Sequence, residues 1–370
     1  MFLPAAHTRY CLDRVTHLHQ LLTGPAEIEG VARLGELWPS LRAAVDRACA
    51  ASDHRLAHAL IRPIVCEGGF RHRHEIGDWA ERILAITPPG DEPLIALALT
   101  AAAQRYHLKQ DPAGYDRLVD RHGQPDHPVA RHTRANVHDD NAAQIASAPA
   151  TLAELRRIGA DDLAEQVEVD LGAALLFQGH YAEGDALLDR LADRYRSQGP
   201  PTLLNWTLML LGFSAAFQHK KDRADHLFDE ALSVPIPERT HSPVRSVQAR
   251  ALFRRGDRPA AYRVLRAYLD ELLDTDNMQG TCVAAIDFVN MMAAASRYPD
   301  SARILGFLDT TGLLDNTAWA TLVADTRDAL AATGEPASDA TRINDHRQAL
   351  AYMRHTLGQL VIADGANTQP

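Results

Sequence analysis

The chain has 370 residues, enough for two globular domains or for one extended array of repeats. Its 38 basic and 48 acidic residues give a net charge of −10 and alternate along the sequence, so no basic stripe is present that would bind nucleic-acid phosphates. The four cysteines form no Cys-x-x-Cys pair, which predicts free thiols in a reducing compartment.

The N-terminal stretch MFLPAAHTRYCLDR lacks the charged start and long apolar segment of a signal peptide, and we expect residues 1–30 to form a lead-in helix. The longest apolar runs, such as TLMLLGF from Thr207, are too short to span a membrane. We therefore expect a cytoplasmic protein that has no membrane partner.

Apolar residues fall at helical spacing along almost the whole chain. The segment from residue 34 shows this pattern in one stripe, and Pro39 is interpreted there as a helix start. No alternating run with hairpin signals occurs, so we expect an all-α protein. Two apolar stripes illustrate the helical spacing: Leu34, Leu37, Leu41, Val45 and Ala48, and near the C-terminus Ile343, Leu350, Met353, Leu357 and Leu360.

The segment LFQGHYAEGDALL, residues 176–188, contains a pattern that recurs along the chain. Its small residue Gly184 has counterparts at Ala224, Ala261 and Ala302, so the period is 37 to 41 residues. Imperfect copies surround Gly114 and Ile76, and the long interval from Gly114 to Gly184 leaves room for another degenerate copy. Periods in this range are typical of stacked helix pairs, because one pair cannot bury its apolar face alone.

Glycines near these small residues predict close packing within each pair. Leu-Gly pairs place Gly172 and Gly212 twelve residues before Gly184 and Ala224, where a missing side chain lets a partner helix approach. Gly179 and Gly256 are assigned to the turns between helices.

This pattern predicts a tetratricopeptide-like helical-repeat superhelix, an α-solenoid of about seven or eight helix pairs. We expect the repeat domain to cover residues 31–360 and residues 361–370 to form a disordered tail.

Three segments resemble the tetratricopeptide-like arm of large actinobacterial regulators, in which a P-loop ATPase module is joined to a LuxR-type or other DNA-binding domain or to a nucleotide cyclase. The segments are LWPSLRAAVDRACAASDHRLAHAL (37–60), GGFRHRHEIGDWAERIL (68–84) and DSARILGFLDTTGLLDNTAW (300–319). No GxxxxGK[ST] motif is present, and nothing after Leu360 is long enough for a helix-turn-helix, so the resemblance covers the arm alone. It implies a non-catalytic binding module with a peptide, a partner protein or a small inducer as its ligand, or an accessory subunit of a separate ATPase or transcription regulator. The oligomeric state is left open by the sequence, and a homodimer is considered because exposed terminal repeats often dimerise.

The sequence also contains histidine-rich and acidic segments that are candidates for catalytic or metal sites. A histidine-rich stretch spans residues 107–138, but gaps of five and six residues place its imidazoles on different helix faces, so no metal site is predicted. The segment RHRHEIGD departs from the HExxH motif, and its RHRH (Arg71–His74) is interpreted as a solvated helix end. A metal-dependent or hydrolytic enzyme using the histidine-rich stretch stays as the alternative. Its members are His107, His122, His127, His132 and His138.

No catalytic group or cofactor is predicted. The chain lacks a Gly-x-Ser-x-Gly elbow, and no nucleophile, base and orienting group can be proposed together. The acidic turns GDEP (90–93) and GADD (159–162) are interpreted as helix N-caps.

A partner groove is expected on the concave face that the first helix of each pair would line. Its inward positions are mostly apolar, with Trp206 and Met209 at the centre and Arg250 and Asp287 as polar contacts, and would suit an amphipathic helix, a peptide or an apolar small ligand. The competing interpretation is that these residues only pack successive repeats together. The groove residues are Gln166, Trp206, Met209, Phe213, Arg250, Phe253, Asp287 and Met291.

Overall fold

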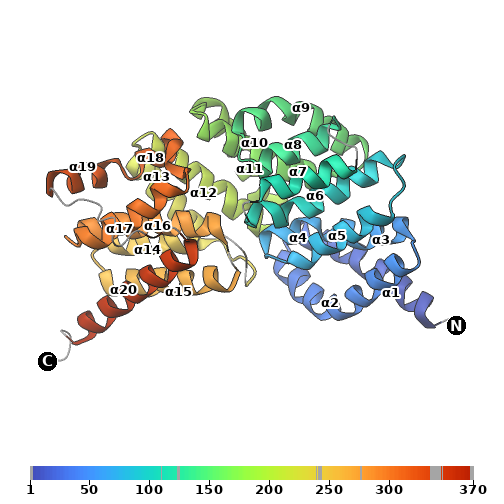
Figure 1. Cartoon of the computed structure of the whole chain (residues 1–370), viewed down its shortest axis with the longest axis horizontal. Coiled ribbons are helices and arrows are strands. Elements are labelled where there is room, and N and C mark those ends of the chain that lie inside the picture. Colours follow the sequence, from blue (N-terminus) through green and yellow to red (C-terminus); the bar gives the residue numbers. More distant parts are fainter. Residues whose placement is uncertain are drawn as a thin grey trace. The chain divides into compact units, whose positions relative to one another are not determined.

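The computed structural model describes residues 3–109, 111–122, 126–238, 240, 244–275, 277–333, 343 and 345–366 (Figure 1). These residues form helices and turns without a strand, which confirms the predicted all-α class. The chain divides into two compact units: unit 1 comprises Met1–Thr207 and Val234–His241, and unit 2 comprises Leu208–Ser233 and Ser242–Pro370. Within the described ranges, no helix is both long and apolar enough to cross a membrane.

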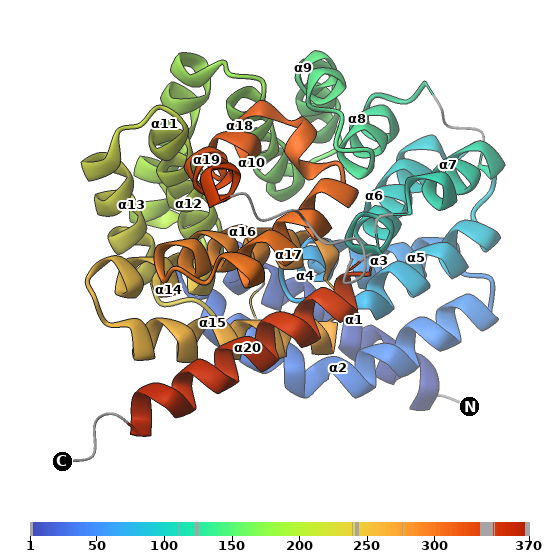
Figure 2. The same cartoon turned by 60° about the vertical axis from the view of Figure 1, so that its left-hand side comes forward.

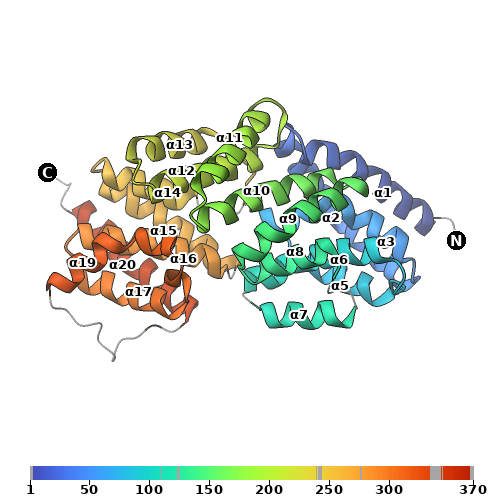
Figure 3. The ribbon, with the colours of Figure 1, turned by 90° about the horizontal axis from the view of Figure 1, so that it is seen from above.

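Unit 1 is built from helices that pack on their neighbours in sequence. Helix α1 packs on α2, α5 on α6, α8 on α9, α9 on α10 and α10 on α11, while α6 also packs on α8 (Figure 3). Its elements are α1 (Leu3–Leu22), α2 (Glu27–Ala50), α3 (His54–Ile61), the 3₁₀ turn η1 (Arg62–Ile64), α4 (Val65–Phe70), α5 (His74–Ile86), α6 (Glu92–Lys109), α7 (Pro112–Arg121), α8 (Pro128–Val137), α9 (Asn141–Arg157), α10 (Asp161–Phe177), α11 (Tyr181–Gln198) and the start of α12 (Pro201–Phe217).

Unit 2 continues the same sequential pairing. Helix α14 packs on α13 and on α15, and α16 packs on α17. The last helix, α20, returns to lie along α15 (Figure 2). The elements after α12 are α13 (Lys221–Ser233), α14 (Val244–Arg254), α15 (Arg258–Thr275), α16 (Met278–Ala294), α17 (Tyr298–Thr310), the 3₁₀ turn η2 (Leu313–Asp315), α18 (Thr317–Thr321), α19 (Ala324–Thr333) and α20 (His346–Ala366). The predicted array of helix pairs is therefore confirmed.

Close packing of α10 against α11 depends on two glycines, as the sequence predicted. A Cβ at Gly172 would lie 2.5 Å from Leu188 Cδ2, and a Cβ at Gly184 would lie 2.7 Å from Leu176 Cδ2. Gly212 occupies the same position in the next repeat, where a Cβ would overlap the ring of Phe228. Gly172 and Gly212 thus leave room for the large residue that follows the small anchor of each pair, and the anchor Gly184 leaves room for Leu176 on the partner helix.

The turns between paired helices share one backbone geometry. Gly179 and Gly256 have φ angles of +79° and +88°, and His219 and Ser296 adopt the same left-handed conformation at 56° and 60°. In each turn the next amide donates to a carbonyl five residues back, as His180 N does to Leu175 O at 2.8 Å. This is the Schellman ending of an α-helix, which confirms the assignment of both glycines to turns.

In two of the repeats, this turn geometry places the small anchor one residue away from its predicted position. The small anchor lies five residues after the left-handed residue, which gives Gly184 after Gly179 but Ser301, not Ala302, after Ser296. Ser301 is fully buried, whereas Ala302 is only partly buried. The prediction favoured alanine on size alone. Serine fits because its hydroxyl donates to Val289 O at 2.9 Å, which satisfies a polar group inside the pair.

The same rule corrects the imperfect copy near Ile76. Its structural anchor is Gly77, whose missing Cβ would lie 3.0 Å from Arg105 Cβ. The interval between Gly114 in α7 and Gly184 in α11 holds one further helix pair, α8 and α9, before α10 begins the pair of Gly184, so the degenerate copy expected there is present.

Helix limits also differ from the sequence expectations. Pro39 lies inside α2 and does not start a helix, because buried Leu34 and Leu37 before it continue the apolar face of Leu41 after it. Helix α2 also crosses residue 30, the expected end of the lead-in. Helix α20 extends to Ala366, within the stretch expected to form a tail, and residues 367–370 lie outside the described ranges.

Candidate functional site: a pocket beside α3 and α6

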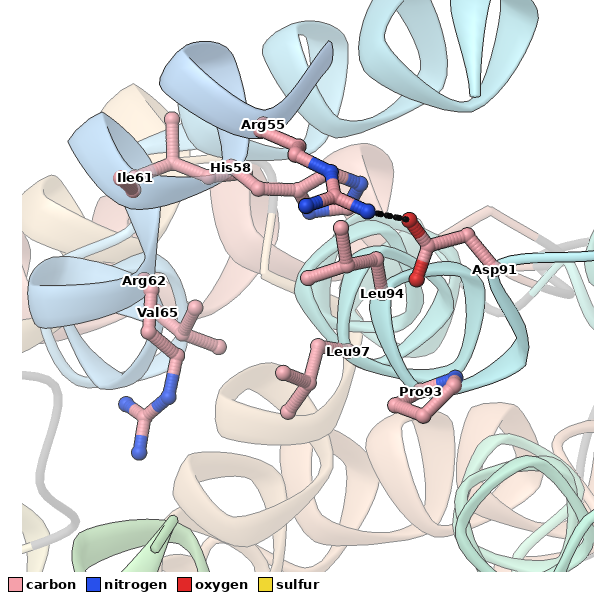
Figure 4. A pocket seen from close by; sticks show the side chains of 10 residues that line it. Arg55, His58, Ile61, Arg62, Val65, Asp91, Pro93, Leu94 and Leu97 are labelled. Atoms are coloured by element: carbon pink, nitrogen blue, oxygen red, sulfur yellow. Dashed lines mark ion pairs between the residues drawn. The ribbon is translucent and has the colours of Figure 1, made fainter. Parts of the chain in front are cut away.

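A pocket of about 470 Å³ lies in unit 1, between the segment α3–η1–α4 and the start of α6 (Figure 4). Leu94 and Leu97 project into it from α6, and Arg55 reaches across its rim to Asp91. The volume is within the range of about 300–1,000 Å³ that is usual for small-ligand sites. The lining residues are Arg55, His58, Ala59, Ile61, Arg62, Val65, Asp91, Pro93, Leu94 and Leu97.

Pro63 shapes one wall of the pocket. Proline has no amide hydrogen, so the α-helical ladder of α3 gives way to the 3₁₀ turn η1 at Arg62. The Pro63 carbonyl accepts a hydrogen bond from His19 Nδ1 at 2.8 Å, which ties the turn to α1. The break separates α3 from α4 and brings Arg62 and Val65 to the pocket.

The end of α5 positions the buried histidine of the pocket. Thr87 precedes Pro88 and adopts an extended conformation, because a residue before proline avoids the helical region. The Thr87 hydroxyl donates to Ile83 O at 2.7 Å, so it accepts from His58 Nε2 at 3.2 Å. The proton of neutral His58 therefore resides on Nε2.

His58 carries no charge at neutral pH. Burial lowers its pKa to about 4, and the nearby His54 acts in the same direction, while Asp91 opposes them. His58 is 4% exposed, so removing the charged form from water is the dominant cost. It contributes an uncharged polar edge to the pocket.

Arg62 is already neutralised by an acidic residue. Its Nη1 donates to Asp162 Oδ2 at 2.9 Å, and its Nη2 contacts the other carboxylate oxygen, which gives a two-point ion pair. This pair holds the pKa of Asp162 below its usual range, against the effect of burial. His19 Nε2 lies 3.9 Å from the same carboxylate. Arg62 is thus held at the wall by a committed partner.

Asp91 is held more loosely. It immediately precedes α6, and its backbone carbonyl accepts from Ile95 N at 3.0 Å. The side chain has two cationic neighbours, His54 Nε2 at 3.5 Å and Arg55 Nη2 at 3.9 Å. Both distances exceed the usual hydrogen-bond length of about 2.9 Å. The Arg55 side chain is 80% exposed, so this ion pair is weak.

The predicted groove residues divide between the two units. Gln166 and Trp206 belong to unit 1 and are half-buried. Met209, Phe213 and Met291 are buried in unit 2, at 0%, 5% and 2% exposure. Burial gives these three a packing role, which was the competing interpretation.

The polar members of the predicted groove do meet, inside unit 2. Arg250 Nη1 lies 3.4 Å from Asp287 Oδ1, and Ser246 donates to Asp287 Oδ2 at 2.6 Å. The Arg250 guanidinium lies over the ring of Phe228, 4.9 Å from its centroid. Asp287 is 2% exposed, and burial raises its pKa despite the ion pair. Phe253 is half-buried and packs against Tyr262, with ring centroids 6.0 Å apart.

Four of the five histidines of the histidine-rich stretch have separate partners. His138 Nε2 lies 2.9 Å from Asp116, His127 lies 3.8 Å from Glu154, and His107 lies 3.9 Å from Asp139. His132 Nδ1 contacts Ser147 Oγ at 3.0 Å. Within the described part of the chain, no group of three histidine, cysteine or acidic side chains lies close enough to hold a metal ion.

The interpretation of RHRH as a solvated helix end is wrong. Arg71 is 7% exposed and forms ion pairs with Glu27 and Glu67, and its Nη2 donates to Thr202 Oγ1 at 3.1 Å. Glu27 also accepts from Thr202 N at 2.8 Å, so it caps the start of α12. The pattern misled because two of the partners that enclose Arg71, Glu27 and Thr202, lie on helices distant in sequence.

The pocket is not predicted by the sequence. Asp91 and Asp162 are there interpreted as members of acidic turns, and no role is predicted for Arg55, His58 or Arg62. A usable signal was present in two prolines: Pro63 interrupts an apolar helical stretch, and Pro88 fixes the end of α5. Pairing across 100 residues, as between Arg62 and Asp162, has no local signal.

Comparisons with protein-family models, curated proteins and solved structures found no match to this chain. The chemistry of the pocket and the packing of the helices are therefore the basis for the functional argument.

Proposed function

We propose that this chain is a non-catalytic helical-repeat binding module with a regulatory role, and that its pocket beside α3 and α6 takes a small, mainly apolar ligand. The supporting observation is the cavity of about 470 Å³, whose lining combines six apolar side chains with four polar ones. Pockets with a predominantly apolar lining and a few fixed polar groups are the usual form of small-ligand sites. The apolar members are Ala59, Ile61, Val65, Pro93, Leu94 and Leu97.

The polar groups of the pocket favour binding over catalysis. His58 is neutral and donates to Thr87, whose hydroxyl is committed to a backbone carbonyl. Arg62 is committed to Asp162. Neither arrangement pairs a nucleophile with a base, which acyl-transfer or hydrolytic chemistry would need.

The regulatory part of the proposal draws on the resemblance of three segments to the arm of actinobacterial regulators. A repeat array that binds a small inducer could then change its contacts with a partner protein, such as a separate ATPase or transcription regulator in the cytoplasm. Helix pairs stacked in sequence support this role, because repeat arrays commonly present binding surfaces rather than catalytic centres.

The test is to replace a small residue of the pocket lining with a large one that occupies the cavity. Ala59→Trp places a large ring among the lining residues, whereas Ala50→Trp makes the same substitution at an exposed position at the end of α2. Isothermal titration calorimetry would measure binding of three small probes of similar shape: 2-phenylethylamine, 2-phenylethanol and 3-phenylpropanoate. We expect at least one probe to bind the unmodified protein and Ala50→Trp, and to lose binding in Ala59→Trp. Absence of binding by all three, or equal binding to both variants, would refute the pocket as a ligand site.

A further inference from the structure

The charges around the pocket leave one acceptor without a close donor. No described residue donates a hydrogen bond to the carboxylate of Asp91; its neighbours His54 and Arg55 approach only to 3.5 and 3.9 Å. His54 is a cation only when protonated, and the Arg55 side chain is 80% exposed to water. The Asp91 side chain is 24% exposed and lines the cavity, so it is accessible from inside.

The pocket offers no matching surplus of positive charge. The charge of Arg62 is neutralised by its two-point contact with Asp162, and His58 is uncharged with its Nε2 hydrogen directed to Thr87. A ligand carboxylate would compete with Asp91 for Arg55 and would bring two negative charges into one small cavity. The net charge of −10 on the chain also disfavours an anionic ligand at long range.

A positively charged ligand fits each of these features. An ammonium group can donate directly to Asp91, and the exposed Arg55 can swing into solvent at little cost. Leu94 and Leu97 project from α6 beside Asp91 and provide an apolar wall for the rest of the ligand (Figure 4).

We propose that the pocket binds a small apolar amine, whose ammonium group pairs with Asp91 and whose apolar body packs against Val65, Leu94 and Leu97. This inference rests on the proposed function of the pocket as a ligand site. It adds the chemical class of the ligand and assigns Asp91 as the residue that determines specificity.

The experiment compares the same three probes across charge variants. Calorimetry would be run on the unmodified protein, on Asp91→Asn, and on Arg55→Gln, with Asp46→Asn as a matched control at an exposed ion pair on α2. We expect 2-phenylethylamine to bind about tenfold more tightly than 2-phenylethanol or 3-phenylpropanoate, since charge-assisted hydrogen bonds exceed neutral ones by such amounts. Asp91→Asn should remove that preference, Arg55→Gln should keep or strengthen amine binding, and Asp46→Asn should change nothing.

Different outcomes separate the two proposals. If the alcohol or the acid binds as tightly as the amine and Ala59→Trp abolishes that binding, the pocket is a ligand site but the amine assignment is wrong. An unchanged amine affinity in Asp91→Asn would overturn the assignment as well. If no probe binds, both proposals fail. Thermal unfolding of each variant, with Asp91→Glu as the charge-preserving substitution, distinguishes loss of binding from loss of folding.

Discussion

At the scale of single residues, the fold depends on positions where a side chain is missing. Gly172 faces Leu188, which is fully buried, and Gly184 faces Leu176 across the same helix pair. These glycines lie inside helices, where glycine costs about 1 kcal/mol relative to alanine. Their presence is explained by the contact, because any larger residue would have to displace a leucine of the core.

The close contact at Gly172 predicts that replacing it with alanine has the opposite effect from the same substitution at an exposed glycine. Gly172→Ala should destabilise the protein by about 1–3 kcal/mol, because the new methyl group overlaps Leu188. Gly35→Ala, on the exposed face of α2 with nothing within 4 Å, should stabilise it by about 0.5–1 kcal/mol. Urea-induced unfolding followed by circular dichroism measures both. Equal effects of the two substitutions would contradict the packing role of Gly172.

At the scale of elements, one turn is used repeatedly with different residues. Gly179 and Gly256 adopt positive φ at no steric cost, whereas His219 and Ser296 adopt it with a side chain present. The small anchors reveal the repeat in the sequence, but they do not show that Ser301, and not Ala302, is the anchor of its pair. A short turn that accepts glycine, histidine or serine has no single sequence signature. The position of each small anchor was therefore predicted from the spacing of the anchors alone.

The shared turn geometry predicts paired changes of opposite sign. Gly179→Ala should destabilise the protein by about 1 kcal/mol, because an alanine methyl group is strained at a φ of +79°. His219→Gly should stabilise it by a few tenths to about 1 kcal/mol, since it relieves the same strain at 56°. Thermal or urea unfolding of the two variants against the parent protein tests both signs. A destabilised His219→Gly would show that the imidazole makes contacts that outweigh its backbone strain.

The sequence predicts the helices and their pairing but not the pocket, for a physical reason. Helical periodicity and small anchors are local properties, so the all-α class and the helix pairs followed from them. The pocket depends on Arg62 meeting Asp162 and on Thr87 orienting His58, contacts that only the folded chain creates. Likewise, burial turned Met209 and Met291 into core residues, which apolar spacing alone cannot distinguish from a groove.

At the scale of the whole molecule, buried histidines link stability to pH. Burial lowers the pKa of His58 and of His132 to about 4, below the value of about 6.5 expected in the unfolded chain. Between these values the unfolded state binds more protons, so each histidine makes stability fall as the pH drops from 6.5 toward 4. Glu67 acts oppositely: burial raises its pKa to about 7, so its contribution falls as the pH rises through 7.

A single substitution should isolate one of these contributions. His132→Asn keeps a side-chain donor for Ser147 but cannot be protonated, so the stability of this variant should depend less on acid. Lowering the pH from 7 to 5 should reduce the free energy of unfolding of the variant by on the order of 1–2 kcal/mol less than it reduces that of the parent protein. Urea unfolding at pH 7, 6 and 5 measures this difference. The control is His17→Asn, which makes the same change at an exposed position of α1.

Helix α12 has a consequence for how the chain unfolds. The boundary between the two compact units falls after Thr207, near the middle of this helix, whereas domain boundaries usually fall in exposed linkers. Buried Glu27 and Arg71 hold its first turn, and its later residues, including Phe213, are part of the core of unit 2. Since helix formation is cooperative along a continuous run of residues, melting either half of α12 removes support from the other. Helix α12 therefore contributes to the fold of each unit, with its first residues in unit 1 and its later residues in unit 2.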